Sequence, residues 1–184
     1  MVLIRLANEA DAAGIALVYR PYVEGSRISF EEQAPDAAEM ARRIVGERPG
    51  FHPWLVAGEG GRILGFASSS PFRTRPAYRW SVETGIYLAP DACGRGLGKG
   101  LLAALTALLE GQGYVAAIGA IALPNDPSVR LHEALGFTPA GTYRGTGFKL
   151  GTWIDVGLWQ KDLAPRSPSP AKPLPFEGLF SPPA

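Results

Sequence analysis

The chain has 184 residues, of which 46% are hydrophobic, with 18 Lys and Arg against 17 Asp and Glu. This length and composition suit one globular domain with a core that needs neither disulfides nor metals. The net charge of +1 argues against nucleic acid as the main partner, because binding to backbone phosphates usually requires a strong basic excess.

Cysteine and histidine are scarce in this chain. The single cysteine, Cys93, excludes an internal disulfide and favours a reducing, cytoplasmic location. One cysteine and two distant histidines do not make a standard zinc site. The first residues include early acids and no long apolar run, which is unlike a secretory signal. No apolar stretch has the length of a membrane span, so no membrane partner is expected.

Hydrophobic periodicity predicts alternating strands and helices over the first 163 residues. Asn8 and Asp36 are placed to cap the first two helices, and Gly136 to end the last one. Residues 21–35 are expected to be irregular. Such an order predicts an α/β protein, an α+β sandwich with a mixed sheet. The predicted elements are a strand at 2–6, helices at 9–19 and 37–48, strands at 54–59 and 63–69, a strand–loop–helix unit at 81–109, a strand at 114–123, a helix at 128–135, and strands at 138–143 and 152–159.

The composition changes at Ala164, where prolines become frequent. A segment so rich in proline does not fold alone, and we expect an extended tail. The chain therefore divides into a domain over residues 1–163 and a proline-rich tail over residues 164–184. Three apolar side chains of the tail could dock on the body or on a second subunit: Phe176, Leu179 and Phe180.

The strand–loop–helix unit at residues 81–109 reads SVETGIYLAPDACGRGLGKGLLAALTALL. An apolar run ends in a glycine-rich turn, and the turn opens into a helix with leucines at spacings of three and four. Backbone N–H groups of such a turn, together with the N-terminus of the helix, favour a bound phosphate. Three phosphate-binding patterns compete for this turn.

Two of the three patterns fail. A nucleotide P-loop requires Ser or Thr after its lysine, but Gly100 follows Lys99, and Cys93 stands at the position of the first glycine. The dinucleotide pattern is met at Gly94 and Gly96 until Lys99 takes the place of the last glycine, and that pattern belongs near the start of a βαβ unit. The pattern x-x-G-x-G remains, beside the plain alternative of a glycine turn before a core helix.

The x-x-G-x-G loop, followed by Asn125 after the next strand and by Leu135-Gly136-Phe137, resembles the GCN5-related N-acetyltransferase (GNAT) superfamily. The resemblance covers nearly the whole chain and is closer to one family within it. The segments similar to phosphinothricin N-acetyltransferases are WLVA (54–57), AYRWSVE (77–83), LPNDPSVRLHEALGF (123–137), GFKLGTWIDVGLWQ (147–160) and the proline-rich tail.

This resemblance implies the GNAT fold, a mixed and mostly antiparallel sheet of about six to seven strands flanked by helices. It implies acetyl-CoA as co-substrate, no metal, and a homodimer. It also implies direct acetyl transfer to the α-amine of a small glutamate-like amino acid, such as phosphinothricin or methionine sulfoximine. Backbone amides of the loop would hold the pyrophosphate of the cofactor. The expected cofactor contacts are Ile86, Tyr87, Leu88, Gly94, Arg95, Gly96, Leu97, Gly98, Lys99, Asn125 and Ser128.

Direct transfer requires a base for the ammonium group, a polarised carbonyl and a proton for the departing sulfur. Glu83 is the predicted base, because the family's catalytic glutamate maps to it and an acid on a largely apolar strand is costly unless it is used or paired. The alternative is a carboxylate that faces solvent or pairs with an arginine. His132 is the predicted general acid or sulfur-side hydrogen-bonding group, and the alternative is a helix histidine satisfied by nearby backbone.

The substrate contacts are predicted on both sides of Glu83. Arg73 and Arg75 could form bidentate clamps on a substrate with a second anionic group, and the alternative is a solvated basic loop. The complete predicted substrate set is Arg73, Thr74, Arg75, Glu83 and Thr84.

Two residues depart from the family pattern: Cys93, where a glutamine or arginine usually opens the cofactor loop, and Ile154, where close relatives often carry histidine. A different substrate preference is therefore open. The alternatives are acetylation of another small amine or of a protein N-terminus, and a non-catalytic sensor that binds coenzyme A.

Overall fold

The computed structural model describes residues 1–180. The strands of this part of the chain form one seven-stranded sheet. The spatial order is β1-β2-β3-β4-β5-β7-β6, and every neighbouring pair is antiparallel except β4 and β5, which are parallel. The predicted mixed, mostly antiparallel sheet is confirmed. The strands are β1 (Leu3–Leu6), β2 (Trp54–Glu59), β3 (Arg62–Pro71), β4 (Ser81–Leu88), β5 (Ala116–Ala122), β6 (Thr138–Lys149) and β7 (Thr152–Asp162).

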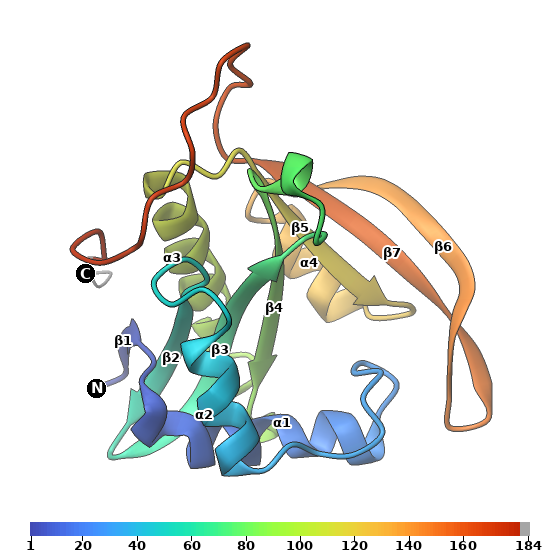
Figure 1. Cartoon of the computed structure of the whole chain (residues 1–184). Helices are drawn as coiled ribbons and strands as arrows, with labels where there is room; N and C mark the ends of the chain where they lie inside the picture. The colour runs from blue at the N-terminus through green and yellow to red at the C-terminus, as the bar shows by residue number, and fades with distance from the viewer. Residues whose placement is uncertain (181–184) are drawn as a thin grey trace.

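Helices cover both faces of the sheet, so the domain has three layers (Figure 1). One pair of helices packs on one face, and the other pair packs on the opposite face. The α-helices are α1 (Ala12–Gly25), α2 (Ala37–Val45), α3 (Leu97–Gly111) and α4 (Asp126–Glu133). Short 3-10 turns precede α1 (Glu9–Asp11), β4 (Pro76–Tyr78) and the glycine loop (Pro90–Ala92).

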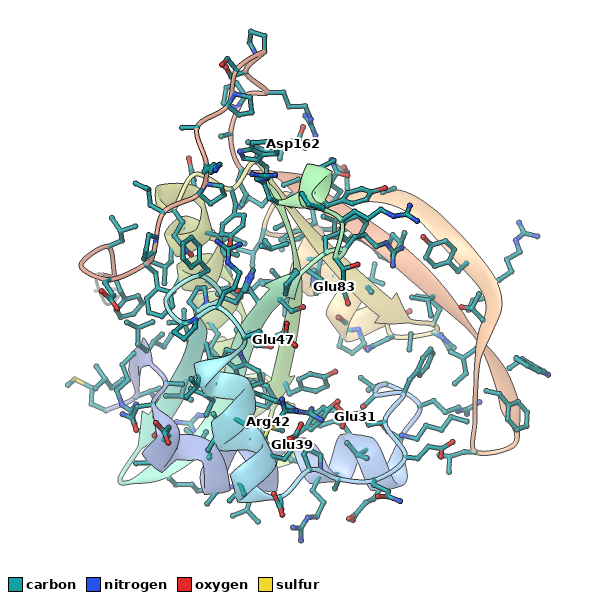
Figure 2. The ribbon with its side chains drawn as sticks, in the orientation of Figure 1. Glu31, Glu39, Arg42, Glu47, Glu83 and Asp162 are labelled. Atoms are coloured by element: carbon teal, nitrogen blue, oxygen red, sulfur yellow. The ribbon has the colours of Figure 1, made fainter. Side chains whose placement is uncertain are left out.

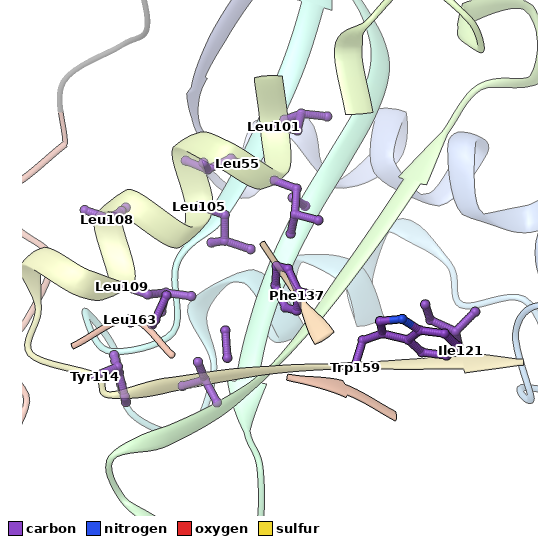
Figure 3. Close-up of a cluster of buried hydrophobic side chains, with 14 of the residues drawn as sticks. Leu55, Leu101, Leu105, Leu108, Leu109, Tyr114, Ile121, Phe137, Trp159 and Leu163 are labelled. Carbon is purple, nitrogen blue, oxygen red and sulfur yellow. The ribbon is translucent and has the colours of Figure 1, made fainter. Parts of the chain in front are cut away.

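The larger core lies between α3 and the sheet (Figure 3). Leu101, Leu105 and Leu109 of α3 are fully buried, as the spacing of three and four predicts for one helical face. They pack with Phe137, which follows α4, and with the strands behind them. This core fixes the start of α3, and with it the glycine loop, against the ends of β3 and β4.

A second core holds α1 and α2 against the other face of the sheet. The tyrosine ring of Tyr19 meets Phe66 of β3 and Tyr87 of β4 edge-on, with centroid distances of 6.1 Å and 4.7 Å. Side chains alternate along a strand, so Glu83 lies on the same face of β4 as Tyr87. Glu83 therefore faces the α1–α2 layer.

Two of the predicted helix ends are wrong. α1 does not end at Tyr19 but continues through Pro21 to Gly25, because Val23 is buried and this packing outweighs the hydrogen bond that proline removes. The predicted cap at Asp36 is confirmed, since its carboxylate accepts a 2.8 Å hydrogen bond from the Glu39 N–H. The helix nevertheless ends at Val45 rather than Arg48, because Gly46 follows it at φ 69°.

The last two strands are longer than predicted and form one extended hairpin. β6 runs on to Lys149 rather than ending at Tyr143, because register shifts in the β6–β7 ladder accommodate the glycine-rich residues 144–147. The turn consists of Leu150 and Gly151 alone, both at positive φ, as two-residue type I′ hairpin turns require. Figure 1 shows this hairpin projecting from the body of the domain.

Residues 171–180 of the tail lie on the body, which is one of the two predicted alternatives. Leu174 exchanges hydrogen bonds with Gln112 at the end of α3, at 2.7 Å and 2.9 Å. The indole of Trp80 donates to the carbonyl of Ala171 at 2.7 Å. Phe176 and Phe180 pack against the α3 core. Pro182 and Pro183 of the tail lie outside the described residues.

Over residues 1–180, no helix combines the length and the apolar character that crossing a membrane requires.

Candidate active site

β4 and β5 separate along their length, and the site lies where they part (Figure 1). Their parallel ladder runs from the Ser81–Ala116 pair to the Thr84–Gly119 pair and ends there. Within the described chain, the edge of β4 that faces β5 therefore has no strand partner from Gly85 onward. Backbone N–H groups on such an edge are held in place and remain available to a ligand.

A cavity of about 460 Å³ occupies this gap. Its walls come from β4, β5, the glycine loop and the start of α3, α4, and the α1 side of the domain. It gathers most of the residues predicted to bind the cofactor, which lie far apart in sequence. Those that line it are Ile86, Tyr87, Leu88, Gly94, Gly96, Gly98, Lys99, Asn125 and Ser128.

The glycine loop presents the N-terminus of α3 to the cavity. Gly96 is the residue before the helix and has φ 78°, a left-handed conformation that costs other residues about 1–2 kcal/mol. The first N–H groups of an α-helix have no intrahelical partner, and the helix dipole makes this end positive. Lys99 adds a side-chain cation to the same wall. The loop can therefore hold a phosphate-bearing ligand.

Two residues predicted as cofactor contacts do not line the cavity. The side chain of Arg95 is ion-paired with Glu59 at 2.9 Å and is not part of the cavity wall. Leu97 packs among the hydrophobic side chains of the α1–α2 layer. Their place in the sequence motif does not distinguish backbone contact from side-chain contact.

Glu83 is half-buried on β4, one residue before Thr84, which lines the cavity. Burial raises the pKa of its carboxyl group, and the positive charge of Arg73 partly offsets that rise. Figure 2 shows Glu83 near the middle of the molecule, apart from Glu31 and Glu39, which are paired with arginines at α2. A carboxylate with a raised pKa is better suited to accept a proton near neutral pH than an ordinary glutamate.

The predicted substrate residues of the β3–β4 connection line a different cavity, of about 430 Å³. Arg73, Thr74 and Arg75 border it together with the α2–β2 connection and the tail. Arg73 also donates a 3.3 Å hydrogen bond to the hydroxyl group of Tyr143 on β6, and its charge acts on Glu83. Of these three residues, Arg73 is thus the one with a described interaction at Glu83.

His132 lies on the opposite face of the sheet from Glu83. A Cβ atom added to Gly119 of β5 would come within 2.6 Å of His132 Nε2, so only glycine leaves room for the imidazole there. Nδ1 donates to the carbonyl oxygen of Ser128 at 2.8 Å, which leaves Nε2 without a proton in the neutral form. Burial lowers the pKa of His132. The imidazole is only 3% exposed but reaches the cavity wall.

Asn125 caps the N-terminus of α4. Asn125 is the residue before α4, and its side-chain oxygen accepts from the Ser128 N–H at 3.4 Å. The helix therefore begins at Asp126, two residues earlier than predicted, and Ser128 does not cap it. Asn125 keeps its amide donors for other partners while lining the cavity.

The sequence interpretation missed the contribution of α1 and the loop after it. Tyr22 lines the cavity and donates a 2.7 Å hydrogen bond to the carbonyl oxygen of Leu88. Ile28 of the α1–α2 loop lines it as well. Both residues fall in the stretch predicted to be irregular, where no periodic pattern assigns a face. Cys93, noted as a departure, also borders the cavity.

The described residues contain no group of three or more His, Cys, Asp or Glu side chains that could hold a metal ion.

Comparison with known proteins gives consistent matches. Residues 4–158 match the family model for the acetyltransferase (GNAT) domain. The phosphinothricin N-acetyltransferase of Streptomyces viridochromogenes is 41% identical over 176 residues, which cover 94% of both chains. The L-methionine sulfoximine/L-methionine sulfone acetyltransferase of Pseudomonas paraeruginosa is 33% identical over 168 residues, which cover 91% of this chain and 98% of that protein.

A solved structure matches the fold along the same span. The GNAT superfamily phosphinothricin acetyltransferase from Sinorhizobium meliloti, crystallised in complex with acetyl-CoA, superposes with a TM-score of 0.83. It is 38% identical, and the match covers 88% of each chain.

Proposed function

This chain belongs to the GNAT acetyltransferase family, and we propose that it transfers the acetyl group of acetyl-CoA to the α-amine of a small glutamate-like amino acid. The observation that carries the proposal is the cavity where β4 and β5 part, with the glycine loop on its wall and Glu83 beside it. The relatives named for phosphinothricin and methionine sulfoximine support the substrate class.

The residues present fit acetyl-CoA. The loop from Gly94 to Lys99 combines positive-φ glycines, the N-terminus of α3 and a lysine, which suits a pyrophosphate. The open edge of β4 suits a chain that carries amide groups, as the pantetheine arm does, and Asn125 adds amide donors on the facing wall. When bound, acetyl-CoA supplies the thioester from which the acetyl group is transferred.

Glu83 is proposed as the base that takes a proton from the substrate ammonium, directly or through a water. Only the free amine attacks a carbonyl, so this step must precede transfer. Its half-buried position on the α1–α2 face keeps the pKa of the carboxyl group above that of an exposed glutamate. The next residue, Thr84, lines the cavity. The hydroxyl group of Thr84 donates a 3.3 Å hydrogen bond to the Ile118 carbonyl oxygen.

Backbone N–H groups of residues 86–88 on the open edge of β4 are proposed to stabilise the negative charge that develops on the carbonyl oxygen. His132 approaches the cavity from the other face of the sheet, which suits a role on the sulfur side. Because its pKa is lowered, the neutral form prevails near pH 7, and Nε2 then accepts a hydrogen bond rather than donating one. Proton donation by His132 requires its minor, cationic form.

Arg73 and Arg75 are proposed to bind the anionic groups of the substrate, with Thr74 between them. Arginine pairs with carboxylate and phosphinate oxygens through two parallel hydrogen bonds. Neither guanidinium forms an ion pair within the described residues, so both charges are available to a ligand.

The proposal is tested by measuring coenzyme A release from acetyl-CoA with a panel of amines. The panel comprises phosphinothricin, methionine sulfoximine, glutamate, putrescine and a peptide with a free N-terminus. We expect the highest kcat/KM for the first two compounds, and a fall of at least tenfold for Arg73→Gln through a higher KM. Preference for putrescine or the peptide would overturn the substrate class, and no turnover of any amine would favour a coenzyme A sensor.

We further propose a homodimer that uses the projecting β6–β7 hairpin. Phe148 and Trp153 lie side by side on it at a centroid distance of 5.1 Å, and Trp153 is 67% exposed. Large exposed aromatic side chains that gather in one place mark an interface. The chemistry of this patch fits a second copy of the chain, because an identical hairpin offers the same apolar pair.

Light scattering coupled to gel filtration tests the dimer. We expect a mass of twice 19.5 kDa for the natural chain and of 19.5 kDa for Trp153→Glu. Leu17→Glu is the matched control, because Leu17 is equally exposed, at 66%, but lies on α1 away from the hairpin. A natural chain that elutes as a monomer, or a Trp153→Glu variant that remains dimeric, contradicts the proposal.

A further inference from the structure

The α1–α2 loop, residues 26–36, forms a wall of the cavity without being a helix or a strand. Its Ile28 lines the cavity, and the loop lies in the α1–α2 layer, which is the face that Glu83 points to. A loop in this place shapes the site for the acceptor amine only if it is held in one conformation. Its contacts show what holds it.

The inner side of the loop is anchored to both helices that it joins. Ser29 is 3% exposed, and its hydroxyl group lies 2.6 Å from that of Tyr19 on α1. Tyr19 also donates to the carboxylate of Glu31 at 2.9 Å. The same carboxylate receives two hydrogen bonds from Arg43 of α2, at 2.7 Å and 3.0 Å.

The outer side of the loop is held to the β6–β7 hairpin by Lys149. This lysine is the last residue of β6, at the tip of the hairpin. Its ammonium group donates to the carbonyl oxygen of Ser29 at 2.7 Å and to that of Val23. Val23 lies in the last turn of α1, where carbonyl groups lack helical partners and a positive charge is favourable.

A second contact beside Lys149 fixes the next residue of the loop. Gly147 lies on the same face of β6 as Lys149, two residues earlier. A Cβ atom there would come within 2.2 Å of the ring of Phe30, so the aromatic ring fills the space that the glycine leaves. The hairpin therefore contacts two consecutive loop residues, Ser29 and Phe30. Phe148 points to the opposite face and stays available to the proposed dimer contact.

We propose that Lys149 is a positioning residue for the acceptor amine. By tying the hairpin tip to the α1–α2 loop, it holds Ile28 in the wall of the site. The inference rests on the proposed function, because it assigns the acceptor to the Glu83 side of the cavity. Among the described residues, Lys149 forms no hydrogen bond with the glycine loop that is proposed to hold acetyl-CoA, so we expect the effect on the amine to exceed the effect on acetyl-CoA.

Lys149→Met removes both hydrogen bonds and keeps the length of the side chain. We expect faster amide hydrogen exchange in peptides covering residues 26–36, and a KM for the amine raised about tenfold, since two charge-assisted hydrogen bonds are lost. The KM for acetyl-CoA stays within about twofold of its natural value. Lys149→Arg restores both readouts, because a guanidinium can reach two carbonyl oxygens.

Lys161→Met is the matched control, since Lys161 lies on β7 with no hydrogen bond from its side chain among the described residues. We expect Lys161→Met to show the same amide hydrogen exchange in residues 26–36 as the natural chain, and the same KM values for the amine and for acetyl-CoA. Unchanged amide hydrogen exchange of residues 26–36 in Lys149→Met would show that Lys149 does not hold the loop. Faster exchange with an unchanged KM for the amine would show that the loop is held but that this does not position the amine. Failure of the natural chain to acetylate any amine overturns the proposed function, while the exchange result still decides the tie.

Discussion

At the scale of single residues, the strand position of Glu83 decides its chemistry. It is one residue from the cavity wall, half-buried, and faced by Arg73, so desolvation and a nearby charge act on it in opposite directions. Sequence alone identifies the acid on an apolar strand but not this balance, because the arginine approaches from a loop whose path no pattern predicts. His132 shows the same limit: its place in the motif is visible, while its tautomer follows from the Ser128 carbonyl.

Arg73→Gln is predicted to move the acid limb of the profile of kcat against pH to higher pH. Glu83 must be deprotonated to act as a base, so kcat rises as pH increases through its pKa. Burial raises that pKa and the charge of Arg73 lowers it, so removing the charge raises it further. Arg79→Gln is the control, because Arg79 does not act on Glu83. If the acid limb of the profile of kcat against pH does not move in Arg73→Gln, then Arg73 does not lower the pKa of the catalytic base.

At the scale of elements, the glycine loop was predictable from a sequence pattern, whereas the path of the tail was not. The motif predicts the loop and the start of α3 correctly, because the glycines are required by backbone conformation, which is local. The helix through Pro21 and the hairpin to Lys149 depend on packing with distant segments, and their ends were therefore predicted wrongly. The path of the tail also depends on packing with distant segments, namely α3 and Trp80.

Gly96→Ala is predicted to weaken acetyl-CoA binding about tenfold, because a side chain at φ 78° costs about 1–2 kcal/mol or forces the loop amides to turn. Steric crowding is not the reason, since apart from its chain neighbours no atom of the described residues lies within 4 Å of the added Cβ. Gly111→Ala at the other end of α3 is the control, with equal space and no positive φ. Titration calorimetry measures both, and equal dissociation constants would refute the prediction.

Phe176→Ala is predicted to destabilise the domain by about 2 kcal/mol, because the ring packs against the α3 core. For a chain of this size the midpoint of thermal unfolding falls by roughly 4–8 °C. Ser169→Ala, also in the tail but exposed, leaves the midpoint unchanged. Calorimetry or circular dichroism provides the measurement. A natural midpoint in Phe176→Ala would mean that the tail contributes no stability through this ring.

At the scale of the whole molecule, the sheet brings the two halves of the site together from opposite faces. Glu83 on β4 faces the α1–α2 layer, and His132 lies on α4 at the opposite face of the sheet. The gap between β4 and β5 connects the two faces. Recognition of the motifs predicts this fold, since the family's spacing covers nearly the whole chain. The part played by Lys149 could not be predicted, because residues 120 positions apart meet only in the folded chain. The cytoplasmic location and the homodimer stay predictions.

The account's central claim is that acetyl transfer in this cavity depends on the carboxylate of Glu83. The most direct test compares Glu83→Gln with the natural chain in coenzyme A release and in acetyl-CoA binding. We predict a kcat lower by about 10²- to 10⁴-fold at an unchanged dissociation constant, because the amide keeps the shape of the side chain but cannot take the proton. Turnover at the natural rate in Glu83→Gln would contradict the claim.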